Sequence, residues 1–321
     1  MRGALAAAPR LSVEVGGLRL KNPLLAASGT FGYGLEYAAT ADLSVLGGLV
    51  TKGLYLEPRD GCPTPRIVET PSGLLNAIGL QGVGVRAFVE KVLPALRRYD
   101  TAVLVNVCGD TVDEYAEVTR ALDEAEGVAG VEVNISCPNV KKGGMAFGGD
   151  PRMTFEVVSA VRRATRLPVV PKLSPNVADI AVFARASEEA GADALSCINT
   201  LLGLVVDVEA RRPRLAFGTG GLSGPAIRPI AVRMAWQAAR AVKIPVIGIG
   251  GIASAEDALE FMIAGCRAVQ IGTANFVDPG LYPRVLAGLA DYLRRHALDD
   301  INRVVGTLEY PGLPAAEELG G

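Results

Sequence analysis

Short runs of β-branched and other apolar residues alternate along the chain with longer stretches in which apolar residues recur every three or four positions. Short runs are typical of buried strands and the longer stretches of helices, so the alternation indicates repeated βα units. Two helices are predicted with particular clarity, one from Asp113 to Glu126 and one that has Ser254 as its N-cap and stops at Gly265. Eight strands are predicted, at residues 24–28, 48–52, 102–107, 131–136, 169–174, 194–200, 245–251 and 268–274.

Eight βα units in a chain of 321 residues predict an α/β fold, a (β/α)8 TIM barrel, as one domain over residues 1–321. An open doubly wound sheet is the alternative, but no Gly-x-Gly-x-x-Gly follows the first strand. Ahead of the barrel, residues 11–23 alternate around Gly16 and Gly17, which predicts a hairpin that plugs the bottom of the barrel. Residues 1–10 and 312–321 are expected to be flexible tails.

Two connections are too long to be plain loops between a strand and a helix. Residues 53–82 follow the second strand, and residues 201–224 follow the sixth. Long excursions in compact domains tend to be lids or binding loops. Both excursions are therefore expected to lie over the mouth of the barrel.

Charge and cysteine content narrow the class of protein. The chain has 32 lysine and arginine residues against 34 aspartate and glutamate residues, without a basic block, so nucleic acid is not an expected partner. Its apolar runs are too short for a signal peptide or a membrane span, which predicts a cytoplasmic protein. The five cysteines are scattered without a Cys-x-x-Cys pair, so free thiols are expected, and neither a disulfide framework nor a metal site.

Polar side chains recur where the predicted strands end. A capping role is an equally good explanation for any one of them, but their joint placement predicts a site, because barrel enzymes place their chemistry at the carboxyl ends of the strands. The residues are Ser28, Lys52, Asn106, Asn134, Cys137, Lys172, Asn199 and Thr200. Cys108, Cys197 and Cys266 are instead interpreted as small buried hydrophobic residues, and Cys62 is left unassigned.

Glycine residues lie near the ends of the last two predicted strands. Gly250-Gly251 and Gly272-Thr273 offer backbone N–H groups beside a following helix, which is the usual phosphate site of such barrels, although glycine also serves tight turns. Flavin mononucleotide (FMN) would place its phosphate there and lay its ring across the barrel top, where Lys52 and Lys172 could meet the electron-rich side of the ring. The alternative for either lysine is a buried pair with a carboxylate.

Several ordered motifs resemble those of the class 1 dihydroorotate dehydrogenases over nearly the whole chain. They read ASGTFGYG, NAIGLQ, NISCPNVKKGG, PKLSPN, INT, GGLSGPAI, IGIGGI and GTANF. The forms SCPNVKKGG and INT are most similar to the NAD-linked subclass, 1B. The departures are minor, since Pro171 before Lys172 and the run TKGL after the second strand remove no group that the chemistry uses.

The resemblance implies oxidation of dihydroorotate to orotate in pyrimidine synthesis, with FMN taking a hydride. The single histidine, His296, lies in the last predicted helix, so Cys137 is the candidate base, aimed by the extended conformation that Pro138 imposes on it. Side-chain amides both donate and accept, which suits the edges of a pyrimidine ring. By resemblance the substrate would contact Lys52, Asn76, Asn134, Asn139, Asn199, Thr200 and the backbone of Ala77, Ile78, Gly79 and Leu80.

The resemblance also implies the set of residues around FMN. These are Ser28, Lys52, Gly53, Asn106, Asn134, Lys172, Ile198, Gly224, Gly250, Gly251, Gly272 and Thr273. Subclass 1B enzymes use a second subunit with FAD and a [2Fe-2S] cluster to reduce NAD+, and this chain has no cysteine set for such a cluster. An FAD/iron-sulfur partner and a homodimeric core are therefore expected.

Three alternatives stay open at this level. One is a class 1A enzyme that passes electrons to fumarate. Another is a Schiff-base lyase on a phosphate-binding barrel, with Lys172 or Lys52 as its nucleophile. The third is a subunit that stores flavin or shuttles electrons without a substrate of its own, in which Cys137 and the asparagines would have no function.

Overall fold

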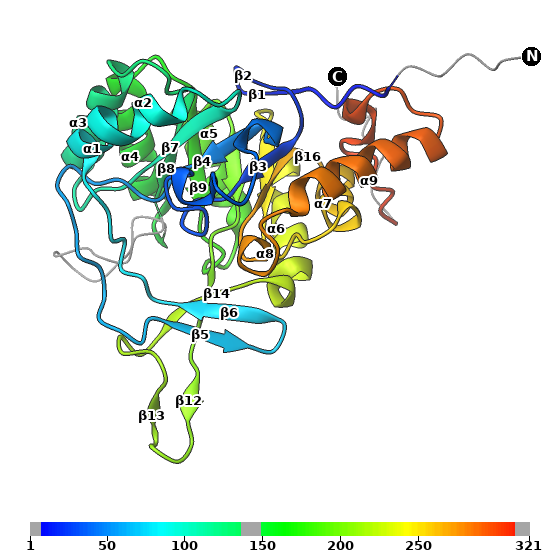
Figure 1. Ribbon diagram of the computed structural model, residues 1–321. Helices are drawn as coiled ribbons and strands as arrows, with labels where there is room; N and C mark the ends of the chain where they lie inside the picture. The colour runs from blue at the N-terminus through cyan, green and yellow to red at the C-terminus, as the bar shows by residue number, and fades with distance from the viewer. Residues whose placement is uncertain (1–7, 136–148, 312–321) are drawn as a thin grey trace, which may run out of the picture.

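Eight parallel strands close into a barrel in the computed structural model, which describes residues 8–135 and 149–311 (Figure 1). Each strand pairs with the next along the chain, and the last pairs back with the first. The strands are β3 (Leu24–Ala26), β4 (Gly48–Val50), β7 (Ala102–Val107), β8 (Gly130–Asn134), β9 (Val169–Leu173), β10 (Leu195–Cys197), β15 (Val246–Ile249) and β16 (Cys266–Ile271). These are the eight predicted strands, so the predicted (β/α)8 barrel is confirmed.

Helices surround the barrel, as the repeated βα pattern predicts (Figure 1). Ser254 caps α7 in a capping box with Asp257, and Gly265 follows that helix with φ +118°, as the sequence predicted. The α-helices are α1 (Val85–Ala87), α2 (Leu93–Leu96), α3 (Val112–Asp123), α4 (Pro151–Ala164), α5 (Ile180–Glu189), α6 (Arg228–Ala241), α7 (Ala255–Ile263), α8 (Ala274–Val277) and α9 (Leu281–Arg295). A π-helical segment, η3 (Phe88–Val92), joins α1 to α2, and short 3-10 turns are η1 (Leu35–Tyr37), η2 (Leu43–Val45), η5 (Pro225–Ile227) and η6 (Ile301–Val304).

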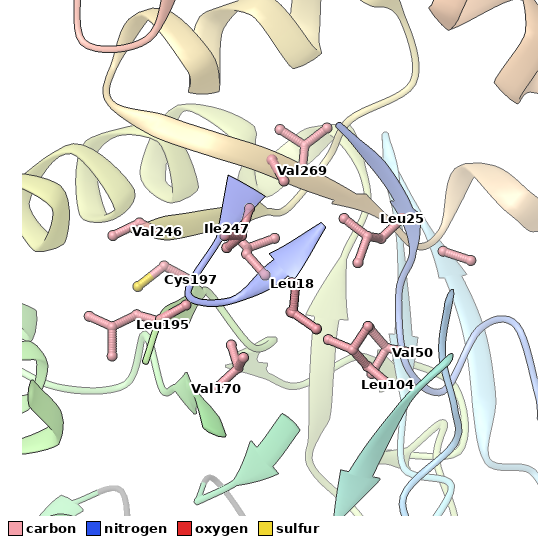
Figure 2. Packing of buried hydrophobic residues seen from close by; sticks show 14 of the residues in the cluster. Leu18, Leu25, Val50, Leu104, Val170, Leu195, Cys197, Val246, Ile247 and Val269 are labelled. Atoms are coloured by element: carbon pink, nitrogen blue, oxygen red, sulfur yellow. The ribbon is translucent and has the colours of Figure 1, made fainter. Parts of the chain in front are cut away.

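The predicted N-terminal hairpin is present as β1 (Val13–Val15) and β2 (Leu18–Leu20), which pair around Gly16 and Gly17. It lies at the amino ends of the barrel strands. A Cβ atom on Gly130, the first residue of β8, would be 3.2 Å from Leu18, and Gly16 lies against the carbonyl of Asp193 just before β10. The hairpin therefore closes the bottom of the barrel, and Leu18 joins the buried core (Figure 2).

The barrel interior changes from apolar to polar along the strands. Leu104 and Asn106 are two residues apart in β7, as are Val170 and Lys172 in β9, so each pair lies on one face of its strand. The apolar member of each pair joins the core (Figure 2), and the polar member lies nearer the carboxyl end. The polar residues therefore gather at the mouth of the barrel, above a closed apolar floor.

The two long excursions, residues 53–82 and 201–224, pair with each other and form one lobe (Figure 1). Within the lobe, β6 lies antiparallel to β14, with Asn76 opposite Gly221. The four-stranded sheet has the order β11-β14-β6-β5, and a two-stranded arm extends from it. The strands are β5 (Ile67–Thr70), β6 (Gly73–Asn76), β11 (Leu201–Gly203), β14 (Gly220–Ser223) and, in the arm, β12 (Val206–Asp207) and β13 (Arg212–Pro213).

The chain near its amino end is tied to its carboxyl-terminal part. The amide of Arg10, a residue expected within the flexible tail, donates to the carbonyl of Asp299 at 2.8 Å, and its guanidinium pairs with Asp300. The remaining tail residues 1–7 and 312–321 lie outside the described residues. No helix within residues 8–135 and 149–311 is long and apolar enough to cross a membrane.

Candidate functional site

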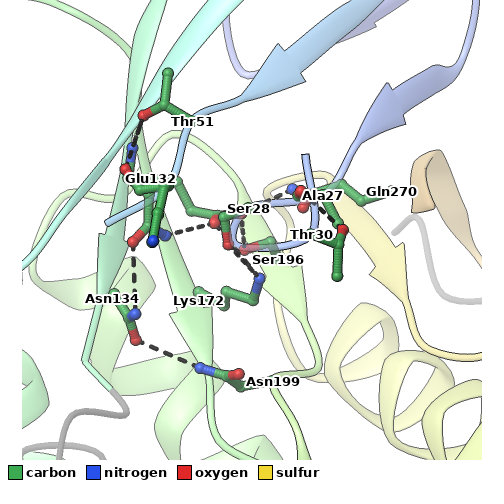
Figure 3. A network of polar contacts seen from close by, with 12 residues as sticks. Ala27, Ser28, Thr30, Thr51, Glu132, Asn134, Lys172, Ser196, Asn199 and Gln270 are labelled. Carbon is green, nitrogen blue, oxygen red and sulfur yellow. Dashed lines mark hydrogen bonds and ion pairs between the residues drawn. The ribbon is translucent and has the colours of Figure 1, made fainter. Parts of the chain in front are cut away.

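A fully buried carboxylate lies at the centre of the polar mouth (Figure 3). Glu132 on β8 accepts a hydrogen bond from Asn106 Nδ2 on one oxygen at 2.7 Å. Its other oxygen accepts from Ser196 Oγ at 2.9 Å and from Gln270 Nε2 at 2.7 Å. The first oxygen also lies 3.6 Å from Lys172 Nζ. Four strands besides β8 thus direct donors at this one side chain.

The asparagine side chains form a hydrogen-bonded chain that leads away from this carboxylate (Figure 3). Asn134 Nδ2 donates to Asn106 Oδ1, and Asn199 Nδ2 donates to Asn134 Oδ1, each at 3.4 Å. Asn199 Oδ1 then accepts from the backbone N–H of Thr200 at 2.8 Å. The structure therefore brings together four of the residues that the sequence predicted at the site.

Lys172 is buried, with 5% of its surface exposed, and it contacts the predicted residue Ser28 and the carboxylate of Glu132. Its ammonium donates to Ser28 Oγ at 3.1 Å and lies 3.6 Å from Glu132. The carboxylate pair that stood as the alternative for this lysine is thus present. The two interpretations are compatible, because the pair lies at the barrel mouth and keeps a buried cation there.

Lys52 follows β4 by two residues and is half-buried. Burial, with a smaller effect from the charge of Arg66, lowers the pKa of its ammonium, and Glu36 opposes this shift. The next residue, Gly53, lies against the network, since a Cβ atom there would be 2.9 Å from Cys108 Sγ and 3.2 Å from Asn106 Oδ1. Gly53, predicted after the second strand, therefore lies beside Asn106, predicted at the end of the third strand.

The predicted substrate segment from Asn76 to Leu80 is held by its neighbours in the lobe. Asn76 Nδ2 donates to the carbonyl of Gly221 at 3.2 Å, and a Cβ atom on Gly221 would lie only 2.1 Å from Thr200 Oγ1. The amide of Ala77 donates to the carbonyl of Arg66 at 2.9 Å. Gly79 and Leu80 have φ of +74° and +53°, so the chain turns sharply there.

The segment also contacts other residues of its own excursion and the loop that follows β7. The carbonyl of Ile78 accepts from the amide of Cys62 at 2.9 Å, and Leu80 packs on Tyr55 and Cys108. Ile198, which follows β10, is buried and donates its amide to the carbonyl of Ile249 at 3.0 Å. The predicted substrate segment is thus fixed by both excursions and by the strand ends.

The predicted phosphate glycines come together from three loops. A Cβ atom on Gly251 would lie 2.8 Å from the carbonyl of Gly224, and one on Gly224 would lie 3.5 Å from Thr273 Cγ2. Within residues 8–135 and 149–311, the amides of Gly251, Gly272 and Thr273 donate to no recorded backbone acceptor. Free backbone donors from neighbouring loops suit a phosphate. Gly250 and Gly251 also have φ of +135° and +74°, so the turn itself requires glycine there.

The cysteines divide as predicted where the structure describes them. Cys108, Cys197 and Cys266 are buried free thiols, and burial raises the pKa of Cys197 well above its usual value. Cys62 is also free and partly exposed. The candidate base Cys137 and the predicted substrate residue Asn139 lie outside the described residues.

Three residues of the network were missed by the sequence analysis: Glu132, Ser196 and Gln270. Glu132 carried a usable signal, because it precedes the predicted Asn134 by two residues in a strand and must share its face. Gln270 and Ser196 lie inside strands and not at their ends, so a search of strand ends does not find them. Ser223, whose Oγ accepts from Thr273 Oγ1 at 2.8 Å, was also missed.

Comparisons with known proteins identify the family of this chain. A family model described as dihydroorotate dehydrogenase matches residues 10–293. The chain is 58% identical over 301 residues to a protein of Geobacter sulfurreducens and 56% identical over 303 residues to one of Geotalea daltonii, in each case over 94% of this chain and 99% of the relative. Both relatives are named dihydroorotate dehydrogenase B (NAD(+)), catalytic subunit. This chain therefore belongs to the dihydroorotate dehydrogenase family.

Proposed function

We propose that this chain oxidises (S)-dihydroorotate to orotate in the de novo synthesis of pyrimidine nucleotides, with FMN as its cofactor and NAD+ as the final acceptor through a partner subunit. One observation carries the proposal. The amides of Asn106, Asn134 and Asn199 converge beside Lys172 at the barrel mouth, in a chain whose relatives carry the name of that enzyme.

The family implies a flavin, and the residues present fit FMN. Ser28, Lys172 and Asn106 would face its ring, with Asn134, Lys52, Gly53 and Ile198 around them. The free amides of Gly251, Gly272 and Thr273, beside Gly224 and Gly250, would hold its phosphate. When bound, the flavin supplies the acceptor for the hydride.

The substrate groups suit a planar ring with alternating N–H and C=O edges. Asn76, Asn134 and Asn199 each offer a donor and an acceptor, and their described contacts hold them in place. Lys52, Thr200, Asn139 and the backbone of residues 77–80 complete the proposed site. A lysine whose pKa is lowered by burial loses less hydration when it meets an anionic carboxylate, so Lys52 suits that group.

The proposed base is Cys137. His296 is excluded from this role by its place, since it ends α9 and its ring lies against Tyr292 with centroids 4.2 Å apart. A free thiol has a pKa of about 8.5, so holding a thiolate at pH 7 costs roughly 2 kcal/mol, and nearby ammonium groups offset part of that cost. Cys137→Ala is expected to retain flavin and to slow its reduction by dihydroorotate by about 10²–10⁴-fold. Flavin reduction at a near-normal rate in this variant would remove Cys137 from the role.

The decisive test of the reaction is optical. The purified protein should be yellow, with one FMN for each chain, and anaerobic dihydroorotate should bleach the flavin absorbance. A yellow protein that dihydroorotate does not bleach would favour a flavin-storing or electron-shuttling subunit. A colourless protein that borohydride traps covalently on its substrate would favour the Schiff-base lyase, which the family membership does not support.

The final acceptor depends on a partner, as the words "catalytic subunit" in the names of the relatives imply. We propose that the partner carries FAD and a [2Fe-2S] cluster and joins a homodimer of this chain. Exposed apolar side chains gather on the lobe and support a protein contact there; they are Ile67, Leu202, Leu204, Val206, Val208 and Phe217. The isolated chain should transfer electrons from dihydroorotate to an artificial dye and not efficiently to NAD+. Robust NAD+ reduction would refute the partner, and turnover with fumarate would assign the chain to class 1A.

A further inference from the structure

Glu132 is a buried charged group to which the proposed chemistry gives no part. The partners of its carboxylate come from the barrel strands β7, β9, β10 and β16. All of these partners are donors. An ionised carboxylate can only accept hydrogen bonds. Each neighbouring side chain must therefore turn a donor group toward it.

The first consequence is the direction of the amide chain. Asn106 must turn Nδ2 toward Glu132, because its Oδ1 would otherwise face a carboxylate oxygen at 2.7 Å. Asn106 Oδ1 is then left to accept from Asn134, and Asn134 Oδ1 to accept from Asn199. One fixed acceptor at the head thereby sets which edge of Asn106 and of Asn134 is the donor, while the backbone N–H of Thr200 holds Asn199 Oδ1 at the other end.

The second consequence concerns charge. Lys172 Nζ lies 3.6 Å from Glu132 and only 6% of its side chain is exposed. The carboxylate both holds this ammonium beside Ser28 and offsets its charge. The net charge under the proposed flavin ring therefore depends on Glu132 as well as on Lys172.

We propose that Glu132 is a positioning residue that fixes the orientation of the amides of Asn106 and Asn134 and sets the effective charge of Lys172. This inference rests on the proposed function and deepens it. Substrate affinity should depend on the hydrogen bond from Asn106 to Glu132, whereas flavin midpoint potential should depend on the negative charge of Glu132. The two effects can be separated by two conservative substitutions.

Glu132→Asp keeps the charge and withdraws the carboxylate by about one C–C bond, roughly 1.5 Å. The hydrogen bond from Asn106 is then out of reach, and the amides of Asn106 and Asn134 lose the acceptor that fixes their direction. The dissociation constant for orotate should rise by about tenfold, which corresponds to the loss of one hydrogen bond to a charged group. The flavin midpoint potential should move much less than in the glutamine variant.

Glu132→Gln keeps the reach and removes the charge. The new amide fits with its carbonyl toward Asn106 and its NH2 toward Ser196 and Gln270, because Gln270 Oε1 is buried without a partner in the described structure and can turn to accept. Orotate should bind within about threefold of the unmodified enzyme. The midpoint potential should shift to a more positive value, because Lys172 then acts with its full charge on a ring that gains negative charge on reduction.

Ser196→Ala is the matched control, since it removes one hydrogen bond to Glu132 on the oxygen that faces away from Asn106 and Lys172. The flavin-loaded variants are titrated with orotate by flavin absorbance, their potentials are measured against reference dyes, and their melting temperatures are recorded. The control should lower the melting temperature and leave the other two quantities unchanged. The proposal is overturned if Glu132→Asp has the same orotate dissociation constant as the control, or if Glu132→Gln has the same flavin midpoint potential as the control. It is also overturned if the dissociation constants and midpoint potentials of both variants change only in proportion to the fall in melting temperature. Unmodified protein that lacks flavin, or that dihydroorotate does not reduce, would instead refute the proposed function, before any variant is compared.

Discussion

Replacing Lys172 by methionine should destabilise the barrel through the carboxylate that it leaves behind. Glu132 has no exposed surface, and Lys172 is the cation beside it, with Nζ 3.6 Å from Oε1. Removing one partner of a buried ion pair costs about 3–5 kcal/mol, because the other charge stays buried without compensation. Asn106, Ser196 and Gln270 still donate to the carboxylate in the variant. The expected loss is therefore at the lower end, about 3 kcal/mol.

The assay is thermal unfolding of flavin-free protein followed by circular dichroism, because bound flavin would add its own stabilisation to the unmodified chain. For a chain of 321 residues the expected loss corresponds to a melting temperature lower by roughly 4–5 °C. Adding Glu132→Gln to Lys172→Met removes the stranded charge and should recover part of that loss. Equal melting temperatures for Lys172→Met and the unmodified chain, or a double variant that simply adds the two single losses, would show that the pair is not energetically coupled.

Three further predictions concern the lysine at the second strand and the glycines of the site. Lys52→Met should leave flavin-free protein at least as stable as the unmodified chain at pH 7, because burial lowers the pKa of the lysine. As pH rises from that lowered pKa toward the ordinary value of about 10.4, the unmodified chain should gain stability relative to the variant. Urea titrations at several pH values measure this difference. Gly221→Ala should weaken orotate binding by at least tenfold and leave flavin content intact, since its Cβ would lie 2.1 Å from Thr200 Oγ1; unchanged affinity in an absorbance titration would contradict this. Gly272→Ala should fold normally, because its Cβ meets nothing closer than 3.6 Å. If the phosphate lies there, the variant should lose FMN, as flavin fluorescence would show. Gly251→Ala is a poor probe, because its Cβ would already lie 2.8 Å from Arg228 Cβ and from the carbonyl of Gly224.

Local patterns were sufficient to predict the barrel. Each strand is a short apolar run bounded by turn residues. The predicted strand-end residues that the structure describes come to the mouth because parallel strands share one carboxyl edge. The hairpin at Gly16-Gly17 and the cap at Ser254 were found for the same reason, since their signals lie within a few residues. These elements depend on neighbours in sequence.

The lobe and the carboxylate network depend on neighbours in space. Nothing near Asn76 indicates that Gly221 will lie opposite it, since the two are 145 residues apart. The sequence analysis therefore predicted two separate loops, and the structure has one sheet. Likewise Glu132 reads as a strand residue until the donors of Asn106, Ser196 and Gln270 are seen around it.

Because the two excursions share one sheet, they fold together and can be exchanged between relatives only together. Strand β6 of the first excursion is completed only by β14 of the second, and pairing across so long a stretch of chain becomes favourable only after the intervening barrel units are ordered. During synthesis, the substrate side of the site therefore cannot be assembled until more than two thirds of the chain has emerged, through Ser223. An engineer who transplants one excursion from a relative to change substrate range must transplant the other with it, because a foreign β6 would have to match the register and side chains of a β14 that was selected for a different partner.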